Sequence, residues 1–261
     1  MITIRNTCST ANLAPVYLPL IRIVLATYQC IFESQLASVR LLGSVARNEA
    51  IVGQSDIDFM GLLTGPPSET LHGALEEAAH GLGAAQTVVT RVDLDVVDGD
   101  QLSEFQRFVL TGDSLQLYGS DDVREGEQHI NRAHLAALVT PRAAELLCDY
   151  RAWAESLDPK GDPATLRRCV RVTSKDLLKC LRGIALIRGG DYEHSIVRTY
   201  QQVVTYVPEQ ADLAARLYAA YCNPALDRSE LLELLALTES AWDSIQPTDS
   251  DRPCDYRIRG A

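Results

Sequence analysis

Positive charge is scarce in this sequence. Among its 261 residues, 24 are Lys or Arg and 35 are Asp or Glu, which gives a formal net charge of −11. Proteins that bind nucleic acid concentrate Lys and Arg on one face, where these residues neutralise phosphates. We therefore expect no nucleic-acid partner. A negative field favours a cationic partner or substrate, because it raises the local concentration of cations.

Sequence motifs for zinc sites and disulfide frameworks are absent as well. The seven cysteines have no CxxC spacing, and the sequence contains no HExxH motif. An odd number of scattered cysteines in a chain of this length does not suggest a disulfide framework. These absences indicate a reducing compartment, and we expect a cytoplasmic protein.

Long uninterrupted hydrophobic runs are also missing. The most apolar window, 13–32, is interrupted by Pro15, Pro19, Arg22 and Gln29, and no basic segment precedes it as in a signal peptide. Its apolar residues have helical spacing, which predicts an amphipathic helix over 16–35. We expect no membrane partner; association of this helix with a membrane surface is the alternative.

The order of the predicted elements divides the chain in two. Strands and helices alternate up to residue 122, and only helical spacing follows. We predict an α+β fold, with an N-terminal mixed-sheet domain over 1–124, an all-α helical bundle over 125–246 and a polar tail over 247–261. The predicted strands are 38–43, 56–63, 87–98 and 115–118, and the predicted helices are 16–35, 45–50, 68–80, 100–110, 129–157, 164–188, 192–206, 210–221 and 229–244.

Two acidic residues lie close together in the second predicted strand. Alternate residues of a strand share a face, so Asp56 and Asp58 point the same way, while Ile57 and Phe59 point into a core. Two carboxylates about 5 Å apart repel by roughly 3 kcal/mol at an effective dielectric of about 20, a cost that a bound divalent cation removes. The pair therefore indicates a metal site; a solvent-facing strand edge, where the repulsion is screened, is the alternative.

The third predicted strand carries a further acid on one face, which is Asp93 or Asp95. If this strand pairs beside the second, three carboxylates converge. Oxygen ligands match Mg²⁺, which shares its sites with substrate phosphates. A pair of such ions would activate an acceptor hydroxyl and neutralise a leaving pyrophosphate. We favour Asp93 as the third residue of a two-ion magnesium site, and Asp95 stays open.

A Gly-Ser pair follows the first predicted strand. Gly43 lets the backbone approach a ligand closely, and the amides after it can donate to phosphate oxygens together with the Ser44 hydroxyl. Arg47 lies one turn further on. The sequence has no Walker A motif, so this would be a different kind of phosphate-binding turn.

Taken in order, Gly43-Ser44, Ser55-Asp56-Ile57-Asp58 and Val92-Asp93-Leu94 resemble the GS…DxD…D signature of the DNA polymerase β-like nucleotidyltransferase superfamily. The segment from Arg107 to Gly119 is similar to the helix and strand that close the minimal nucleotidyltransferase domain. Asn48 departs from the pattern, because a glycine often follows the arginine there.

The resemblance implies a role for each matching residue. Asp56 and Asp58 would bind Mg²⁺, and Asp93 would be a third ligand or the general base. Gly43, Ser44, Arg47 and Ser55 would belong to the ATP-binding set, with Ser44 and Arg47 on the triphosphate.

The helical half is similar in character to that of antibiotic nucleotidyltransferases acting on aminoglycosides or lincosamides. One predicted helix carries a basic stripe, Arg168, Arg171, Lys175, Lys179 and Arg182, and the only other lysine of the chain is Lys160. We expect Lys175 and Lys179 to stabilise the triphosphate and the leaving pyrophosphate. A solvated face paired with acids of neighbouring helices is the alternative.

The sequence therefore predicts an enzyme that transfers AMP from ATP to a hydroxyl of a small cationic molecule of the aminoglycoside type, and releases pyrophosphate. A homodimer is compatible with this prediction. Two alternatives stay open: a nucleotidyltransferase of toxin-antitoxin type that AMPylates a protein, and a non-catalytic nucleotide-binding regulator. The pairs Arg188/His194 and Arg124/His129 fit the loose motif of HEPN ribonucleases, but matches by chance are expected for so short a pattern. Tyr192, Glu193, Tyr200 and Tyr206 are candidates for an acceptor pocket, with core packing as the alternative.

Overall fold

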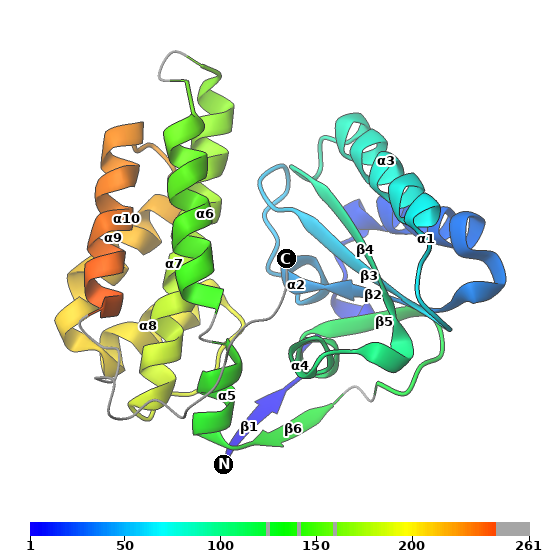
Figure 1. Ribbon diagram of the computed structural model, residues 1–261, viewed down its shortest axis with the longest axis horizontal. Coiled ribbons are helices and arrows are strands. Elements are labelled where there is room, and N and C mark those ends of the chain that lie inside the picture. The colour runs from blue at the N-terminus through cyan, green and yellow to red at the C-terminus, as the bar shows by residue number, and fades with distance from the viewer. Residues whose placement is uncertain (124–125, 140–141, 159–160, 244–261) are drawn as a thin grey trace. The chain divides into compact units, whose positions relative to one another are not determined.

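The computed structural model describes residues 1–123, 126–139, 142–158 and 161–243 (Figure 1). The predicted tail over 247–261 lies outside these ranges, as do Lys160 and Arg124. The chain forms two compact units, one from Met1 to Leu138 and the other from Val139 onward. The first unit is built on a sheet and the second on helices, which confirms the predicted α+β fold.

A four-stranded mixed sheet forms the centre of the first unit. Its strand order is β4-β3-β2-β5. Strands β3 and β4 are parallel, whereas β2 is antiparallel to both of its neighbours. The strands are β2 (Leu36–Leu42), β3 (Ile57–Leu63), β4 (Val92–Asp98) and β5 (Ser114–Gly119). The prediction of a mixed sheet is confirmed.

Helices α1 (Leu18–Phe32) and α3 (Glu69–Ala85) cover one face of this sheet (Figure 1). Leu20, Val24 and Tyr28 of α1 are buried in one core with Ile57 and Phe59 of β3. The segment Pro15–Gln35 is long and apolar enough to cross a membrane by length and composition alone. In this structure its buried face belongs to the core of the first unit.

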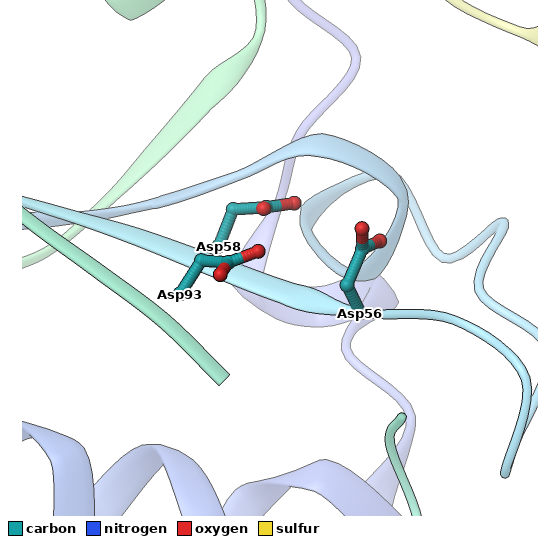
Figure 2. A group of neighbouring side chains, drawn as sticks. All are labelled: Asp56, Asp58 and Asp93. Carbon is teal, nitrogen blue, oxygen red and sulfur yellow. The ribbon is translucent and has the colours of Figure 1, made fainter. Parts of the chain in front are cut away.

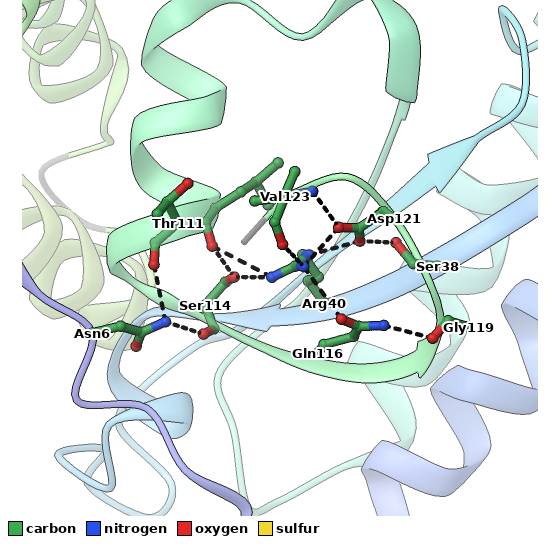
Figure 3. A network of polar contacts seen from close by, with 10 residues as sticks. Asn6, Ser38, Arg40, Thr111, Ser114, Gln116, Gly119, Asp121 and Val123 are labelled. Carbon is green, nitrogen blue, oxygen red and sulfur yellow. Dashed lines mark hydrogen bonds and ion pairs between the residues drawn. The ribbon is translucent and has the colours of Figure 1, made fainter. Parts of the chain in front are cut away.

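The opposite face of the sheet carries α4 (Glu104–Gly112), which begins at a capping box made by Ser103 and Gln106. A small apolar cluster on this face joins Leu62, Leu110 and Val123. Beside it lies Arg40, which is fully buried on β2. Arg40 donates to both carboxylate oxygens of Asp121, at 2.9 and 2.7 Å (Figure 3). This ion pair fastens the segment after β5 to the sheet.

Residues 127–130 correct the predicted domain boundary. The sequence predicts the boundary at 124/125 and a helix from residue 129. Instead, β6 (Glu127–Ile130) pairs antiparallel with β1 (Ile2–Arg5), and α5 (Arg132–Val139) follows it. The strand was missed because Glu-Gln-His-Ile has no alternation of apolar residues. Backbone pairing with a distant segment determines its conformation.

The second unit consists of five helices over the described residues: α6 (Arg142–Ser156), α7 (Pro163–Ile187), α8 (Ile196–Tyr206), α9 (Ala211–Cys222) and α10 (Arg228–Asp243). The last four overlap the predicted helices, whereas β6, α5 and α6 stand in place of the single helix predicted over 129–157. Asp162 is the N-cap residue of α7, and its side chain accepts hydrogen bonds from the first turn, where Pro163 is the first residue. Leu177 and Leu181 of α7 are completely buried in the core of this unit.

The short helix α2 (Gly43–Ala46) and five 3-10 helices complete the described elements. The 3-10 helices are Thr10–Asn12, Pro15–Tyr17, Glu33–Gln35, Gly99–Gln101 and Pro208–Gln210. The second and third of these flank α1, and together with it they fill the predicted helix over 16–35.

Candidate active site

Three carboxylates converge at the start of strands β3 and β4. One oxygen from each of Asp56, Asp58 and Asp93 lies within 4.8 Å of one oxygen from each of the others. Figure 2 shows the three side chains on the same side of the two strands. Within the described ranges this is the one group of three or more acidic, His or Cys side chains that is close enough to hold a metal ion.

The register of the parallel strands brings the acids together. Asp58 is the partner of Asp93 across β3 and β4, and Asp56 directly precedes β3. The side chains of Ile57 and Val92 are buried in the core of the first unit. Successive residues of a strand point to opposite faces, so the acids next to them in the sequence point away from this core. The pairing on which the convergence of the three carboxylates depends is therefore present.

Asp93, and not Asp95, is the residue of β4 that joins the acid pair. The Asp93 carboxylate also forms an ion pair with Arg91, which offsets part of the local negative charge. Asp95 is exposed, and its carboxylate accepts a hydrogen bond from the backbone N–H of Val96 at 2.8 Å.

The trio has the donor chemistry of a magnesium site. Two carboxylates about 5 Å apart repel by roughly 3 kcal/mol at an effective dielectric of about 20, and solvent lowers this value for half-buried groups. All three residues are partly buried and supply only oxygen atoms, which are the ligands that Mg²⁺ prefers. The residues present therefore fit a divalent cation.

The Gly-Ser turn lies directly against this trio. Leu42, the last residue of β2, pairs with Asp58 across the sheet, and α2 (Gly43–Ala46) follows at once. Gly43 has a φ of +71°, and a Cβ atom there would lie 3.0 Å from Oδ2 of Asp58. The backbone conformation strongly favours glycine, and the close approach leaves little room for a larger residue. The predicted turn and the predicted acids thus form one site.

Asn48 has a backbone conformation that glycine adopts readily. Its φ of +59° lies in the left-handed region, which asparagine tolerates better than most residues. The N–H of Glu49 donates to the carbonyl of Ser44 at 2.8 Å, so the chain reverses after Arg47. The departure from the family pattern therefore leaves the turn intact.

Two other residues of the predicted ATP-binding set make contacts within the protein. The Arg47 side chain is only 10% exposed and forms ion pairs with Asp113 and with Glu49, the latter at 2.9 Å. Burial lowers the pKa of Arg47, but the two carboxylates outweigh it, so the net pKa lies above the ordinary value. The Ser55 hydroxyl accepts a hydrogen bond from the N–H of Ile51 at 2.9 Å.

Sequence reasoning missed three charged residues around the site, Glu49, Arg91 and Asp113. Arg91 stands two positions before Asp93 and on the same side of the strand, which is a local signal. Asp113 stands 66 positions after Arg47 and ends α4, so no local pattern connects the two.

The basic stripe of α7 makes contacts inside the second unit. Lys179 forms an ion pair with Asp176 at 2.9 Å, and Asp176 also accepts a hydrogen bond from Tyr150. Burial raises the pKa of Asp176, but the charges of Lys179 and Lys175 and the hydrogen bonds outweigh it and lower the pKa. The role of Lys175 and Lys179 on the triphosphate stays a prediction.

Two arginines of the stripe lie over aromatic rings. Arg171 is 4.7 Å from the centroid of the Tyr221 ring, and Arg182 is 4.1 Å from that of Tyr192. Arg182 also donates to the carbonyl of Glu193 at 2.7 Å. These contacts favour the ion-pairing and packing alternative for much of the stripe.

The residues proposed for an acceptor pocket or a ribonuclease motif also have partners in this unit. Tyr200 stacks on Tyr218 with ring centroids 4.8 Å apart, and Tyr200 and Tyr206 pack against the core. Arg188 forms an ion pair with Glu209, whereas His194 lies edge-on to Tyr192. Core packing therefore accounts for the two tyrosines of α8.

Similarity to known proteins is found in structure and not in sequence. No family model matches the chain, and no curated protein matches it in sequence. Among solved structures, it is similar to the spectinomycin adenyltransferase AAD(9) from Enterococcus faecialis with ATP and spectinomycin. The TM-score is 0.60 and the identity 10%, over 86% of this chain and 98% of that chain.

Two further structures match a smaller part of the chain. One is a toxin-antitoxin with AMP-PNP, with a TM-score of 0.30 and 22% identity over 38% of this chain and 73% of that one. The other is a mutant of the toxin-antitoxin MntA-HpeT, with a TM-score of 0.29 and 22% identity over 38% and 72%.

The adenyltransferase match extends over both units of this chain, and the acid trio and the turn at Gly43 occupy the positions expected from the superfamily signature. The chain therefore has the fold of the DNA polymerase β-like nucleotidyltransferases, with an α+β unit followed in the chain by a helical unit.

Proposed function

We propose that the protein is a magnesium-dependent nucleotidyltransferase that transfers AMP from ATP to a hydroxyl of a small cationic molecule. The observation that carries the proposal is the contact between the glycine turn and the acid trio, because Gly43 approaches Asp58 closely. A phosphate-binding turn beside a divalent-cation site is the arrangement that a nucleoside triphosphate needs.

Asp56, Asp58 and Asp93 are the residues that would hold the metal. When bound there, Mg²⁺ would neutralise charge on the triphosphate and on the leaving pyrophosphate. The turn at Gly43 and Ser44 would donate backbone N–H groups to phosphate oxygens next to the trio. These groups would hold the phosphates of the nucleotide beside the metal site.

The transfer itself exchanges one P–O bond for another. The hydroxyl oxygen of the acceptor forms a bond to the α-phosphorus, and the bond from the α-phosphorus to the oxygen that bridges to the β-phosphorus breaks. The hydroxyl proton passes to a base, and pyrophosphate leaves. Asp93 serves either as that base or as the third metal ligand, since its carboxylate joins the other two from the neighbouring strand.

The acceptor class rests on charge and on the fold. A net charge of −11 favours a cationic acceptor over an anionic one. The fold is shared with a spectinomycin adenyltransferase whose structure contains ATP and spectinomycin. An aminoglycoside-type antibiotic is therefore the acceptor class that we propose.

The experiment supplies ATP labelled on the α-phosphate, Mg²⁺ and a panel of aminoglycosides, spectinomycin and lincosamides. We expect label on one small-molecule class and release of pyrophosphate, both abolished by EDTA. Label on a protein from a cell extract, with none on any antibiotic, would support the AMPylating alternative instead. ATP binding without transfer to either class would support the regulator.

A matched pair of variants tests the site in the same assay. Asp93→Asn should lower the transfer rate by about 100-fold or more, because it removes a group that acts on the reacting centre. Asp95→Asn changes an exposed acid two positions further along the same strand and should keep wild-type activity. Equal activity of the two variants would contradict the assignment of the trio.

A further inference from the structure

Arg47 is held at both sides by carboxylates. Its Nη1 pairs with Asp113 and its Nε donates to Glu49 at 2.9 Å. The side chain of Arg47 is 10% exposed and that of Asp113 is 16% exposed, so water reaches little of this pair. Two negative charges lie around one guanidinium, which leaves little net positive charge to attract a triphosphate.

Asp113 is the connecting residue between α4 and β5, and hydrogen bonds hold this connection in place. Its backbone N–H donates to the carbonyl of Val109 at 2.8 Å and ends the helix. The side-chain amide of Asn6 donates to two backbone carbonyls that flank Asp113 in the sequence, that of Thr111 at 3.1 Å and that of Ser114 at 2.8 Å (Figure 3). The carboxylate of Asp113 is therefore a stable point of attachment.

The sheet places this connection next to the glycine turn. Leu42 pairs with Ser114 across β2 and β5, so the residue before Gly43 and the residue after Asp113 are neighbours. Helix α2 has only four residues, too few to be stable by their own hydrogen bonds. Its N-terminal end is held by Leu42, which is paired in the sheet. Its C-terminal end is held by the ion pair between Arg47 and Asp113.

We propose that the Arg47–Asp113 ion pair anchors the phosphate-binding turn, and that Arg47 is a positioning residue instead of a ligand of the triphosphate. The inference rests on the proposed function, because it assigns the Gly43–Ser44 turn to the phosphates. It changes the role predicted for Arg47 from the sequence, and it adds Asp113 as a residue that acts on the nucleotide through Arg47.

The first measurement is amide hydrogen exchange in the protein without nucleotide. Asp113→Asn keeps the shape of the side chain but removes its charge, so the amides of residues 43–49 should exchange about tenfold faster or more. Glu104→Gln breaks an exposed ion pair with His134 at the other end of α4 and should leave this segment unchanged. Unchanged exchange in Asp113→Asn would overturn the anchor.

The second measurement is the affinity for a non-hydrolysable ATP analogue with Mg²⁺, in a double-mutant cycle. If Arg47 acts only through Asp113, then Arg47→Gln, Asp113→Asn and the double variant should each bind about tenfold more weakly, with no additional loss in the double variant. Thermal unfolding of all three, with Arg47→Lys as a milder variant, shows whether each is folded.

The opposite pattern would identify Arg47 as a triphosphate ligand. In that case Arg47→Gln weakens binding, while Asp113→Asn leaves it unchanged or strengthens it, because a competing carboxylate has been neutralised. If the wild-type protein binds no nucleotide, the proposed function fails, and the hydrogen-exchange comparison still decides whether the pair anchors the turn.

Discussion

Asp58 and Asp93 face each other across the parallel strands β3 and β4, and with Asp56 they crowd three carboxylates into one small volume. Residues that repel one another reduce the stability of the folded protein unless a cation neutralises them. The arrangement therefore links metal binding to stability, and this link can be measured without any knowledge of the acceptor.

The first prediction concerns the stability of the acid trio. Asp58→Asn should raise the free energy of unfolding in EDTA by about 1 kcal/mol, since it removes like-charge repulsion at a partly solvated site. Mg²⁺ should raise the Tm of the wild type and have little effect on the variant. Scanning calorimetry with and without Mg²⁺ measures both effects. A wild-type Tm that does not respond to the metal would contradict the site.

The second prediction concerns the glycine of the turn. Gly43→Ala should destabilise the protein by about 1–2 kcal/mol, because alanine is strained at a φ of +71° and its Cβ would press on Asp58. Transfer activity should fall as well, since the turn and the acid are displaced together. Chemical denaturation and the pyrophosphate assay provide the two measurements.

Gly73→Ala is the matched control for that change. Gly73 is exposed inside α3, and a Cβ there would meet nothing within 4 Å. The substitution should stabilise the protein by about 0.5–1 kcal/mol and leave activity unchanged, because glycine costs conformational entropy in a helix. Similar losses in both variants would mean that glycine-to-alanine changes harm this unit generally.

The third prediction concerns the buried ion pair of Arg40 and Asp121. Asp121→Asn should lower the free energy of unfolding at pH 7 by about 3 kcal/mol, because Arg40 would keep a buried charge without its counter-charge. Denaturant unfolding measures this loss. A loss smaller than that of an exposed pair such as His134–Glu104 would contradict the structural role.

The same pair predicts a dependence on pH. Burial raises the pKa of Asp121, but the hydrogen bonds from Arg40 and Ser38 and the charge of Arg40 outweigh it, so the net pKa lies below its ordinary value of 3.8. A lowered pKa contributes stability that is complete above the ordinary value and is lost as the pH falls through the folded-state value. Wild-type stability should therefore decrease below about pH 4 more steeply than that of Asp121→Asn.

The fourth prediction concerns thiol reactivity. Burial raises the pKa of Cys169 to about 11, and burial together with the charge of Asp176 raises that of Cys180 to about 12. Thiolates are the reactive form, so both residues should resist alkylation in the native protein. Cys30, Cys148 and Cys222 are exposed and should react first. Peptide mapping after brief labelling would detect any early modification of Cys169 or Cys180.

The shared face of Asp56 and Asp58 could be predicted from the sequence, because it depends only on the alternation of residues along one strand. Alternation places Asp56 and Asp58 on one face, and the burial of Ile57 and Val92 fixes which face that is. The structure places Asp93 and not Asp95 beside the acid pair, because the strand register sets Asp93 opposite Asp58. The catalytic role of Asp93 stays a prediction.

The features that could not be predicted depend on distant segments. The resemblance assigns Arg47 to the triphosphate. Glu49 is close to Arg47 in the sequence, but Asp113 becomes its neighbour only through the pairing of β2 with β5, which no local pattern indicates. Strand β6 was missed for a similar reason, since its hydrogen bonds come from β1, at the other end of the first unit's sequence. Long-range pairing leaves little trace in local periodicity.

The double pairing of Leu42, with Asp58 on one side and Ser114 on the other, has a consequence for how this unit tolerates changes in chain length. One residue inserted after Leu42 would shift Gly43 away from the acids and Arg47 away from Asp113 in a single step. The same insertion at Gly65, where a Cβ would meet nothing within 4 Å, would lengthen only an open connection between β3 and α3. Length variation in this unit should therefore be found in that connection and be absent at the end of β2.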